Sequence, residues 1–199
     1  MFLNSSRLIC GTIICILFFT PSIARADNSA LPGSVFTAVM LKALSYDRNI
    51  DRQVKDKIVI GVVSASDDTA GQGFANDVKA NILKVQATYL LKGKPLDADL
   101  VTLDKTFDKA KFEDQLKQAN VSVLVVAVSD SASVGNILEA TKELQVNSIC
   151  GIPGCAKSGV GLEIVQNDNK PKLLSNLDSL KAEGSDYNSK FLAMCEAVK

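Results

Sequence analysis

Residues 121–128 (VSVLVVAV) are the most strongly β-forming stretch of the chain, and they decide its fold class. The stretch is apolar almost throughout and does not alternate between apolar and polar residues. Continuous hydrophobicity is typical of a strand that is covered on both faces, as in a parallel sheet with helices on either side. A loop rich in helix-capping residues follows it, and residues 134–144 then predict a helix.

The order of strand and helix recurs on both sides of this stretch. Residues 57–63, 99–103 and 147–152 predict further short strands. Residues 74–91 and 109–119 predict amphipathic helices, because apolar residues recur there at intervals of three and four. This alternation predicts right-handed crossover units and therefore an α/β fold, a single three-layer domain with a mostly parallel sheet flanked by helices.

The two ends of the domain depart from this alternation. Residues 35–46 are apolar on nearly every helical face, which predicts a helix that the rest of the fold covers. Residues 160–165 and 171–174 are separated by the turn-forming sequence NDNK. They predict a C-terminal antiparallel hairpin at an edge of the sheet.

The chain is expected to finish with two short helices, residues 176–183 and 187–198. Ser185 or Asp186 is placed to cap the second of them. Cys195 falls on that second helix, among apolar neighbours, and is expected to be a buried small hydrophobic residue.

Residues 1–26 predict a secretory signal peptide. Arg7 precedes the apolar run 8–19, and the small-residue site Ala24-Arg25-Ala26 predicts cleavage after Ala26. The run is shorter than the about 20 residues of a membrane-spanning helix, which argues against the alternative of an uncleaved anchor. We therefore expect a periplasmic domain over residues 27–199, with no direct membrane insertion after cleavage.

The composition excludes several classes of function. The chain contains no His, which removes Ser-His-Asp and Cys-His catalysis and the zinc sites that need imidazole. Its 22 basic and 22 acidic residues cancel, so no excess of positive charge predicts binding to nucleic acid. We expect no enzyme, no cofactor and no metal site.

Cys150 and Cys155 flank a Pro-Gly turn, which can fold the chain back so that the two sulfur atoms meet. In an exported protein this pattern favours a disulfide after the fourth strand. Pairing of Cys195 with either of them, which would leave the other free, stays open at this stage. A redox-active dithiol is disfavoured, because the spacing is not Cys-x-x-Cys and no basic cluster lies nearby.

Two polar loops follow the first and third predicted strands, where an open α/β sheet places its ligands. Backbone N–H groups at the helix N-termini there could hold a small anion or an amino-acid carboxylate. Alternatively, the side chains only cap their own helices, and a cation site between Asp67, Asp68 and Asp130 is a further possibility. The candidate ligand residues are Ser64, Ser66, Asp67, Ser129, Asp130 and Ser131.

Short motifs along the chain resemble the YfiR-like family of periplasmic proteins, in this order and spacing. They are residues 43–49 (ALSYDRN), 57–63 (KIVIGVV), 123–126 (VLVV), 159–164 (GVGLEI), 170–172 (KPK), 174–177 (LSNL) and 191–194 (FLAM). The chain lacks the Trp-Pro ending that many relatives carry after the first helix.

The resemblance implies a non-enzymatic regulator that binds the periplasmic part of an inner-membrane signalling protein, a cyclase or a sensor kinase. The best-known members repress a diguanylate cyclase that makes cyclic di-GMP. For Cys150 and Cys155 the resemblance implies a structural or redox-sensing disulfide. A homodimer is compatible with this role.

Two further hypotheses stand beside this one. The alternative is a periplasmic solute-binding module, related to one lobe of a transporter's receptor, that uses the two polar loops. An exported hydrolase is disfavoured because no nucleophile has an evident base beside it.

Overall fold

A computed structural model describes residues 28–52, 54 and 56–198, and in it the chain forms one seven-stranded sheet with the order β2-β1-β3-β4-β5-β6-β7. The predicted signal peptide lies outside the described residues. The strands are β1 (Ile58–Ala65), β2 (Leu96–Leu103), β3 (Val121–Ala127), β4 (Asn147–Cys150), β5 (Leu162–Asn167), β6 (Lys170–Asn176) and β7 (Glu196–Val198). The helices are α1 (Gly33–Leu44), α2 (Thr69–Val85), α3 (Lys109–Gln118), α4 (Ser131–Leu144), α5 (Leu177–Ala182) and α6 (Ser189–Leu192).

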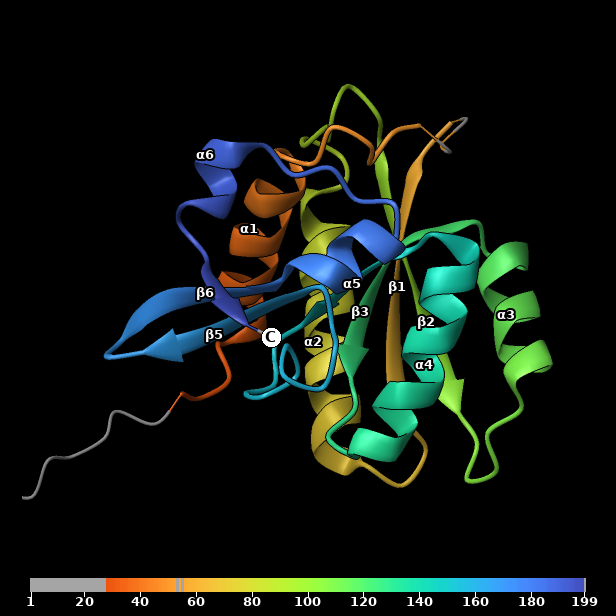
Figure 1. Ribbon diagram of the computed structural model, residues 1–199. Helices are drawn as coiled ribbons and strands as arrows, with labels where there is room; N and C mark the ends of the chain where they lie inside the picture. Colours follow the sequence, from red (N-terminus) through yellow and green to blue (C-terminus); the bar gives the residue numbers. More distant parts are fainter. Residues whose placement is uncertain (1–27, 53, 55, 199) are drawn as a thin grey trace, which may run out of the picture.

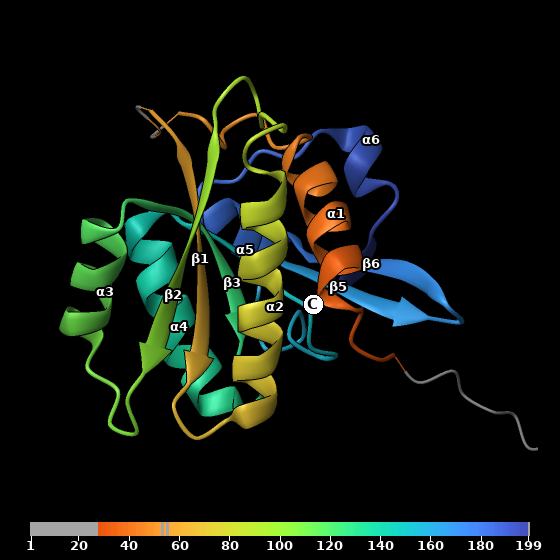
Figure 2. The same ribbon diagram turned by 180° about the vertical axis from the view of Figure 1, so that it is seen from behind.

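The first five strands of this order, β2 to β5, run parallel, and helices cover both faces of the sheet (Figure 1). The rear view shows α1 and α2 against one face, with α3 and α4 on the other (Figure 2). The predicted three-layer α/β fold is therefore confirmed. No helix of the described residues is long and apolar enough to cross a bilayer.

The strand β3 lies between β1 and β4, as its continuous hydrophobicity predicts. Val123 and Val125 belong to the core under α1 and α2, whereas Leu124 and Val126 belong to the core under α3 and α4. All four side chains are fully buried. One strand thus supplies both cores, which is why alternation is absent from its sequence.

The predicted hairpin is confirmed in β5 and β6, which pair antiparallel from Leu162 with Ser175 to Asn167 with Lys170. Its turn residues, Asp168 and Asn169, both have positive φ values, of 47° and 60°. A two-residue turn of this kind matches the twist of the flanking strands, and Asp and Asn adopt it more readily than other side chains.

Helix α2 begins five residues earlier than the sequence predicts, at Thr69. Asp68 caps it, and residues 71–73 lie in its first turns. A Cβ atom at Gly71 would lie only 2.3 Å from the carbonyl oxygen of Ala127. Glycine therefore lets the first turn of α2 approach the end of β3.

The prediction of one helix over residues 187–198 is wrong beyond Leu192. Helix α6 is short, its cap is Asn188 and neither Ser185 nor Asp186, and the chain then forms β7. The strand β7 pairs parallel to β6, where backbone groups at the open edge of the sheet offer hydrogen bonds. Cys195 accordingly lies between α6 and β7, half-buried, and not on a helix.

Candidate functional site

The two loops predicted to bind a ligand do meet at the carboxyl edge of the sheet, where the parallel strands end. The strands β1 and β3 are neighbours, and the Ser129 hydroxyl lies 3.4 Å from a carboxylate oxygen of Asp68. Ser64 is buried within β1, at 5% exposure. The other predicted residues, Ser66, Asp67, Ser129, Asp130 and Ser131, are exposed.

Two aspartates of these loops, Asp68 and Asp130, cap the helices that follow. Asp68 accepts a hydrogen bond from the Gly71 N–H at 2.8 Å, and Asp130 accepts one from the Ser133 N–H at 2.7 Å. The bonds from Ser133 hold the pKa of Asp130 below its ordinary value. Within the described part of the chain, no group of three acidic or Cys side chains could hold a metal ion. The structure thus assigns capping to Asp68 and Asp130.

A disulfide joins Cys150 to Cys155, with 6.3 Å between the two Cα atoms, as the sequence predicts. The third described cysteine, Cys195, is a free thiol, and burial raises its pKa to about 11. The bridge closes the start of the segment between β4 and β5, residues 151–161, which we name the disulfide loop.

A buried carboxylate holds the disulfide loop in place. Glu163 lies on β5 opposite Cys150 and is only 1% exposed. Its two carboxylate oxygens accept hydrogen bonds from the N–H groups of Gly154 at 3.0 Å and Ala156 at 2.8 Å. Sequence reasoning gave Glu163 no role, although an acidic residue within the apolar run 160–165 was the available signal.

Asn176 supports the same loop from the end of β6. Its side-chain amide donates a hydrogen bond to the Ala156 carbonyl at 3.2 Å. Its side-chain oxygen accepts one from the Ser179 N–H at 3.1 Å, which caps α5. The disulfide, Glu163 and Asn176 together fix the loop to three neighbouring strands.

A second buried polar group lies at the amino edge of the sheet, where the parallel strands begin. Asp47, which follows α1, is 1% exposed. Its Oδ1 accepts hydrogen bonds from the N–H groups of Asn49 and Asp186, both at 2.9 Å. Its Oδ2 lies 3.4 Å from the side-chain nitrogen of Asn147, which also contacts the Tyr187 hydroxyl at 2.8 Å. Asp47 thereby joins the end of the first helix to the C-terminal segment.

Glu183 is the other buried acid at this edge, at 1% exposure. Its carboxylate accepts hydrogen bonds from the Ser148 N–H at 2.9 Å and the Thr141 hydroxyl at 2.8 Å. Burial nevertheless raises the pKa of Glu183 to about 6, because loss of solvation outweighs these bonds.

A cavity of about 440 Å³ opens beside Asp47 and Glu183. Its walls come from the segment after α1, the starts of β3 and β4, the ends of α3 and α4, and the turn after α5. The sequence predicts ligand binding at the carboxyl edge of the sheet, and it contains no motif that indicates this cavity at the amino edge.

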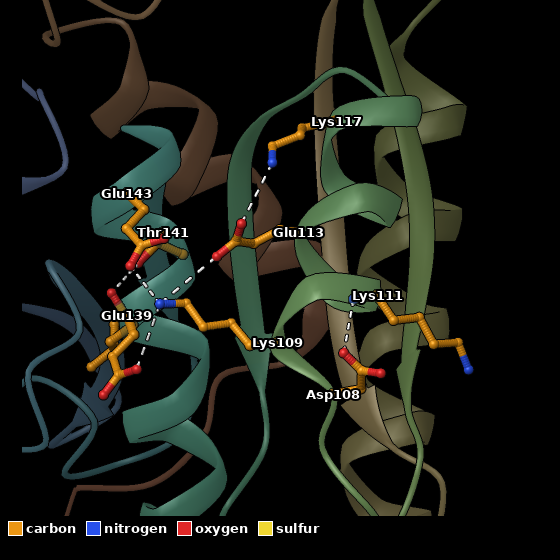
Figure 3. A network of polar contacts seen from close by, with 9 residues as sticks. Asp108, Lys109, Lys111, Glu113, Lys117, Glu139, Thr141 and Glu143 are labelled. Atoms are coloured by element: carbon orange, nitrogen blue, oxygen red, sulfur yellow. Dashed lines mark hydrogen bonds and ion pairs between the residues drawn. The ribbon is translucent and has the colours of Figure 1, made fainter.

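An exposed ion network joins α3 to α4, the two helices whose ends line the cavity. Lys109 of α3 lies 3.7 Å from Glu139 and also contacts Glu143, both on α4 (Figure 3). Glu113 lies between Lys109, at 3.9 Å, and Lys117, at 3.5 Å. The network thus spans the neighbouring faces of α3 and α4, although single exposed pairs stabilise little.

Replacing Glu183 by glutamine should change how stability depends on pH. The folded protein binds the Glu183 proton more tightly than the unfolded chain does, because the fold raises the pKa of Glu183 from 4.5 to about 6. This proton binding stabilises the fold fully below pH 4.5, and the stabilisation is lost as the pH rises through 6. The loss amounts to about 2 kcal/mol of unfolding free energy. Glutamine does not titrate, and it can accept from the Ser148 N–H and donate to the Thr141 hydroxyl.

Urea unfolding of both proteins at pH 4.5 and 7.5 measures this effect. From pH 4.5 to pH 7.5 the original protein should lose about 2 kcal/mol of unfolding free energy that the Glu183→Gln variant keeps. A difference that does not vary with pH would contradict the assignment to Glu183.

Removing the disulfide should lower the free energy of unfolding by about 2 kcal/mol, the chain-entropy value for so short a loop. Urea unfolding of the doubly substituted Cys150→Ala, Cys155→Ala protein measures the loss, with Cys195→Ser as a control that should unfold as the original does. Mass spectrometry of the non-reduced protein should find Cys150 linked to Cys155. A link from either of them to Cys195 would refute the pairing.

Comparisons with known proteins show the fold. No family model matches the chain, and no curated protein matches it. A conserved domain protein from Vibrio cholerae is similar over 84% of this chain and 60% of its own, with a TM-score of 0.55 and 11% identity. The ligand-free, open structure of a substrate binding protein with adhesive properties from Clostridium difficile is similar over 76% of this chain and 58% of its own, with a TM-score of 0.51 and 14% identity. The chain thus spans about three-fifths of the length of either structure, and at these identities the likeness is one of fold and not of function.

Proposed function

We propose that this protein is an exported, non-enzymatic regulator that binds the periplasmic part of an inner-membrane signalling protein, as the YfiR-like family does. The observation that carries the proposal is the disulfide loop, which is fixed by Glu163 and Asn176 while Pro153, Lys157 and Ser158 stay exposed. A surface loop that is rigid before binding loses little conformational entropy when a partner docks.

The motifs that carry the family resemblance also support the proposal. Asp47, in residues 43–49, accepts a hydrogen bond from the N–H group of Asp186, which lies near the far end of the chain. Glu163, in residues 159–164, and Asn176, in residues 174–177, both hold the disulfide loop. These motifs therefore hold the C-terminal segment and the disulfide loop in place, and a binding surface shared with the family would depend on both.

Export to the periplasm belongs to the same proposal. The predicted signal peptide, residues 1–26, would direct the chain there, and disulfides persist in that compartment. The partner that the resemblance favours is a diguanylate cyclase, with a sensor kinase as the other choice.

Capture from native membranes tests the proposal. The protein without residues 1–26 is immobilised and exposed to detergent-solubilised membranes, beside a Lys157→Glu variant of the loop and a Lys84→Glu control on α2, both sites being exposed. We expect capture of a membrane protein that has periplasmic and cytoplasmic signalling parts, weakened by Lys157→Glu and unchanged by Lys84→Glu. Addition of the protein should then lower the activity of a captured cyclase. No captured membrane protein of this kind, or equal capture by both variants, would refute the proposal.

Solute binding at the carboxyl edge is a second candidate function, favoured by the contact between Ser129 and Asp68 that joins the two polar loops. A ligand of the folded state raises the melting temperature. A thermal-shift screen with amino acids, oxyanions and small acids tests it, with Ser66→Ala and Ser131→Ala to locate any effect. A panel without any shift would count against this function.

A further inference from the structure

We propose that Asp97 and Asp99 close the free edge of the sheet, so that this protein does not pair through β2 with a second copy of itself. The strand β2 ends the strand order, and none of the described strands pairs with its outer side. An unpaired strand offers a row of N–H and C=O groups to any other extended chain. The inference does not depend on the proposed regulatory function.

The two open edges of the sheet differ in length. The strand β7 at one end has three residues, which gives a partner strand few groups to pair with, whereas β2 at the other end has eight. Strands of globular proteins most often have about 5–6 residues, so β2 is long for an edge. Its Leu100 is also 37% exposed. A long edge of this kind promotes self-association unless something blocks it.

The hydrogen bonds between β1 and β2 show which backbone groups of β2 point outward. The Ile58 N–H donates to the Pro95 carbonyl, and the Ser66 N–H donates to the Leu103 carbonyl. The register of the two strands is continuous between these bonds. Since alternate residues of a strand face a given neighbour, the odd-numbered residues of β2 face β1. The outward N–H groups are those of Leu96, Ala98, Leu100 and Thr102.

The two central N–H groups of this outward row are covered by side chains of β2 itself. The Ala98 N–H donates to Oδ1 of Asp97 at 2.9 Å. The Leu100 N–H donates to Oδ1 of Asp99, also at 2.9 Å. Each carboxylate thus occupies the donor of the residue that follows it. A second strand could use these donors only after displacing both side chains.

Two lysines hold the carboxylates at the edge. Lys57, just before β1, donates to Oδ2 of Asp97, so the two oxygens of this carboxylate serve different donors. The hydrogen bond from Lys57 is the main cause that holds the pKa of Asp97 below its ordinary value. The Nζ atom of Lys79, on α2, lies 3.8 Å from Oδ1 of Asp99. Both covering side chains are therefore tied to a neighbouring element as well as to their own strand.

The symmetry of self-pairing adds a second obstacle at Asp99. Two copies that pair through the same edge are related by a two-fold axis, so their strands run antiparallel. If all the outward groups pair, Ala98 exchanges both hydrogen bonds with Leu100 of the second copy, and Asp99 lies directly opposite Asp99 of that copy. Like charges directly opposite destabilise a strand pair. Asp99 thus opposes self-pairing both by covering an N–H group and by its charge.

A double substitution, Asp97→Thr with Asp99→Thr, removes the block and keeps polar side chains that suit a strand. In sedimentation equilibrium we expect twice the mass of the original protein, with slower hydrogen exchange at the amides of Ala98 and Leu100. The matched control is Asp97→Asn with Asp99→Asn, which removes the same two charges but keeps an oxygen for each N–H group. The control should have the mass of the original protein.

A third substitution, Leu100→Pro, locates the contact when it is added to the threonine variant. Proline has no N–H to offer, and it is tolerated in an edge strand where the N–H points to solvent. This variant should return to the mass of the original protein, with dispersed amide signals showing that it is folded. A threonine variant with unchanged mass, an asparagine control that associates equally, or an association that survives Leu100→Pro would each overturn the proposal.

Discussion

Replacing Glu163 by alanine is expected to lower the free energy of unfolding by about 3 kcal/mol and to loosen the disulfide loop. The substitution leaves the N–H groups of Gly154 and Ala156 without an acceptor in a site that is almost closed to solvent. An unpaired buried group costs about 1–3 kcal/mol. Urea unfolding measures the loss, and hydrogen exchange should become faster at the amide of Ala156.

Glutamine at position 163 is the matched control, because it keeps the shape of the side chain. Its single oxygen can serve one N–H group, while its amide nitrogen faces the other donor. We expect a loss smaller than that of alanine and above zero. If Glu163→Ala unfolded at the same urea concentration as the original protein, the carboxylate would not be what holds the loop.

Replacing Asp47 by alanine should cost a similar amount, about 3 kcal/mol, and free the C-terminal segment from the first helix. Asp47 accepts the N–H groups of Asn49 and Asp186 and faces the side-chain nitrogen of Asn147. The two N–H groups lose their acceptor together, while the side-chain nitrogen of Asn147 keeps only its contact with the Tyr187 hydroxyl. Faster hydrogen exchange at Asp186, with slow exchange retained in β3, would identify the released segment.

Two further substitutions serve as comparisons for Asp47→Ala. Asp47→Asn keeps an oxygen for the two N–H groups and should be milder than alanine. Asp114→Ala, at an exposed position of α3, should leave the stability unchanged. A loss at Asp114 equal to that at Asp47 would mean that charge alone, and not the buried contacts, explains the effect.

The fold class could be predicted because the sequence of β3 by itself indicates that both faces of the strand are buried. A strand buried on both faces needs apolar residues on both sides, and residues 123–128, all of them buried, supply them. The hairpin turn was also a local signal, since Asp168 and Asn169 tolerate the positive φ that the turn requires. The start of α2 was missed because the sequence TAGQG has little helix propensity, while the cap from Asp68 and the approach to β3 stabilise it.

The buried acids could not be assigned from sequence, because their partners are far away in the chain. The position of Glu163 inside an apolar run was visible, but the loop N–H groups that require it were not. Glu183 depends on Ser148 and Thr141, and Asp47 on Asp186, contacts that only the tertiary fold creates. The short strand β7 escaped prediction for the same reason, since its pairing with β6 outweighs a helical pattern.

The contact between α1 and the C-terminal segment has a consequence for the time course of folding. Tyr46, just after α1, stacks on Phe191 with 5.5 Å between the ring centres, and its carbonyl accepts the Asn188 N–H. The first helix is thus covered by residues that are synthesised about 140 positions later. Contacts of such long sequence separation form slowly. Until then the part of α1 that this segment covers stays exposed, and exposed apolar surface in an incompletely folded chain promotes aggregation.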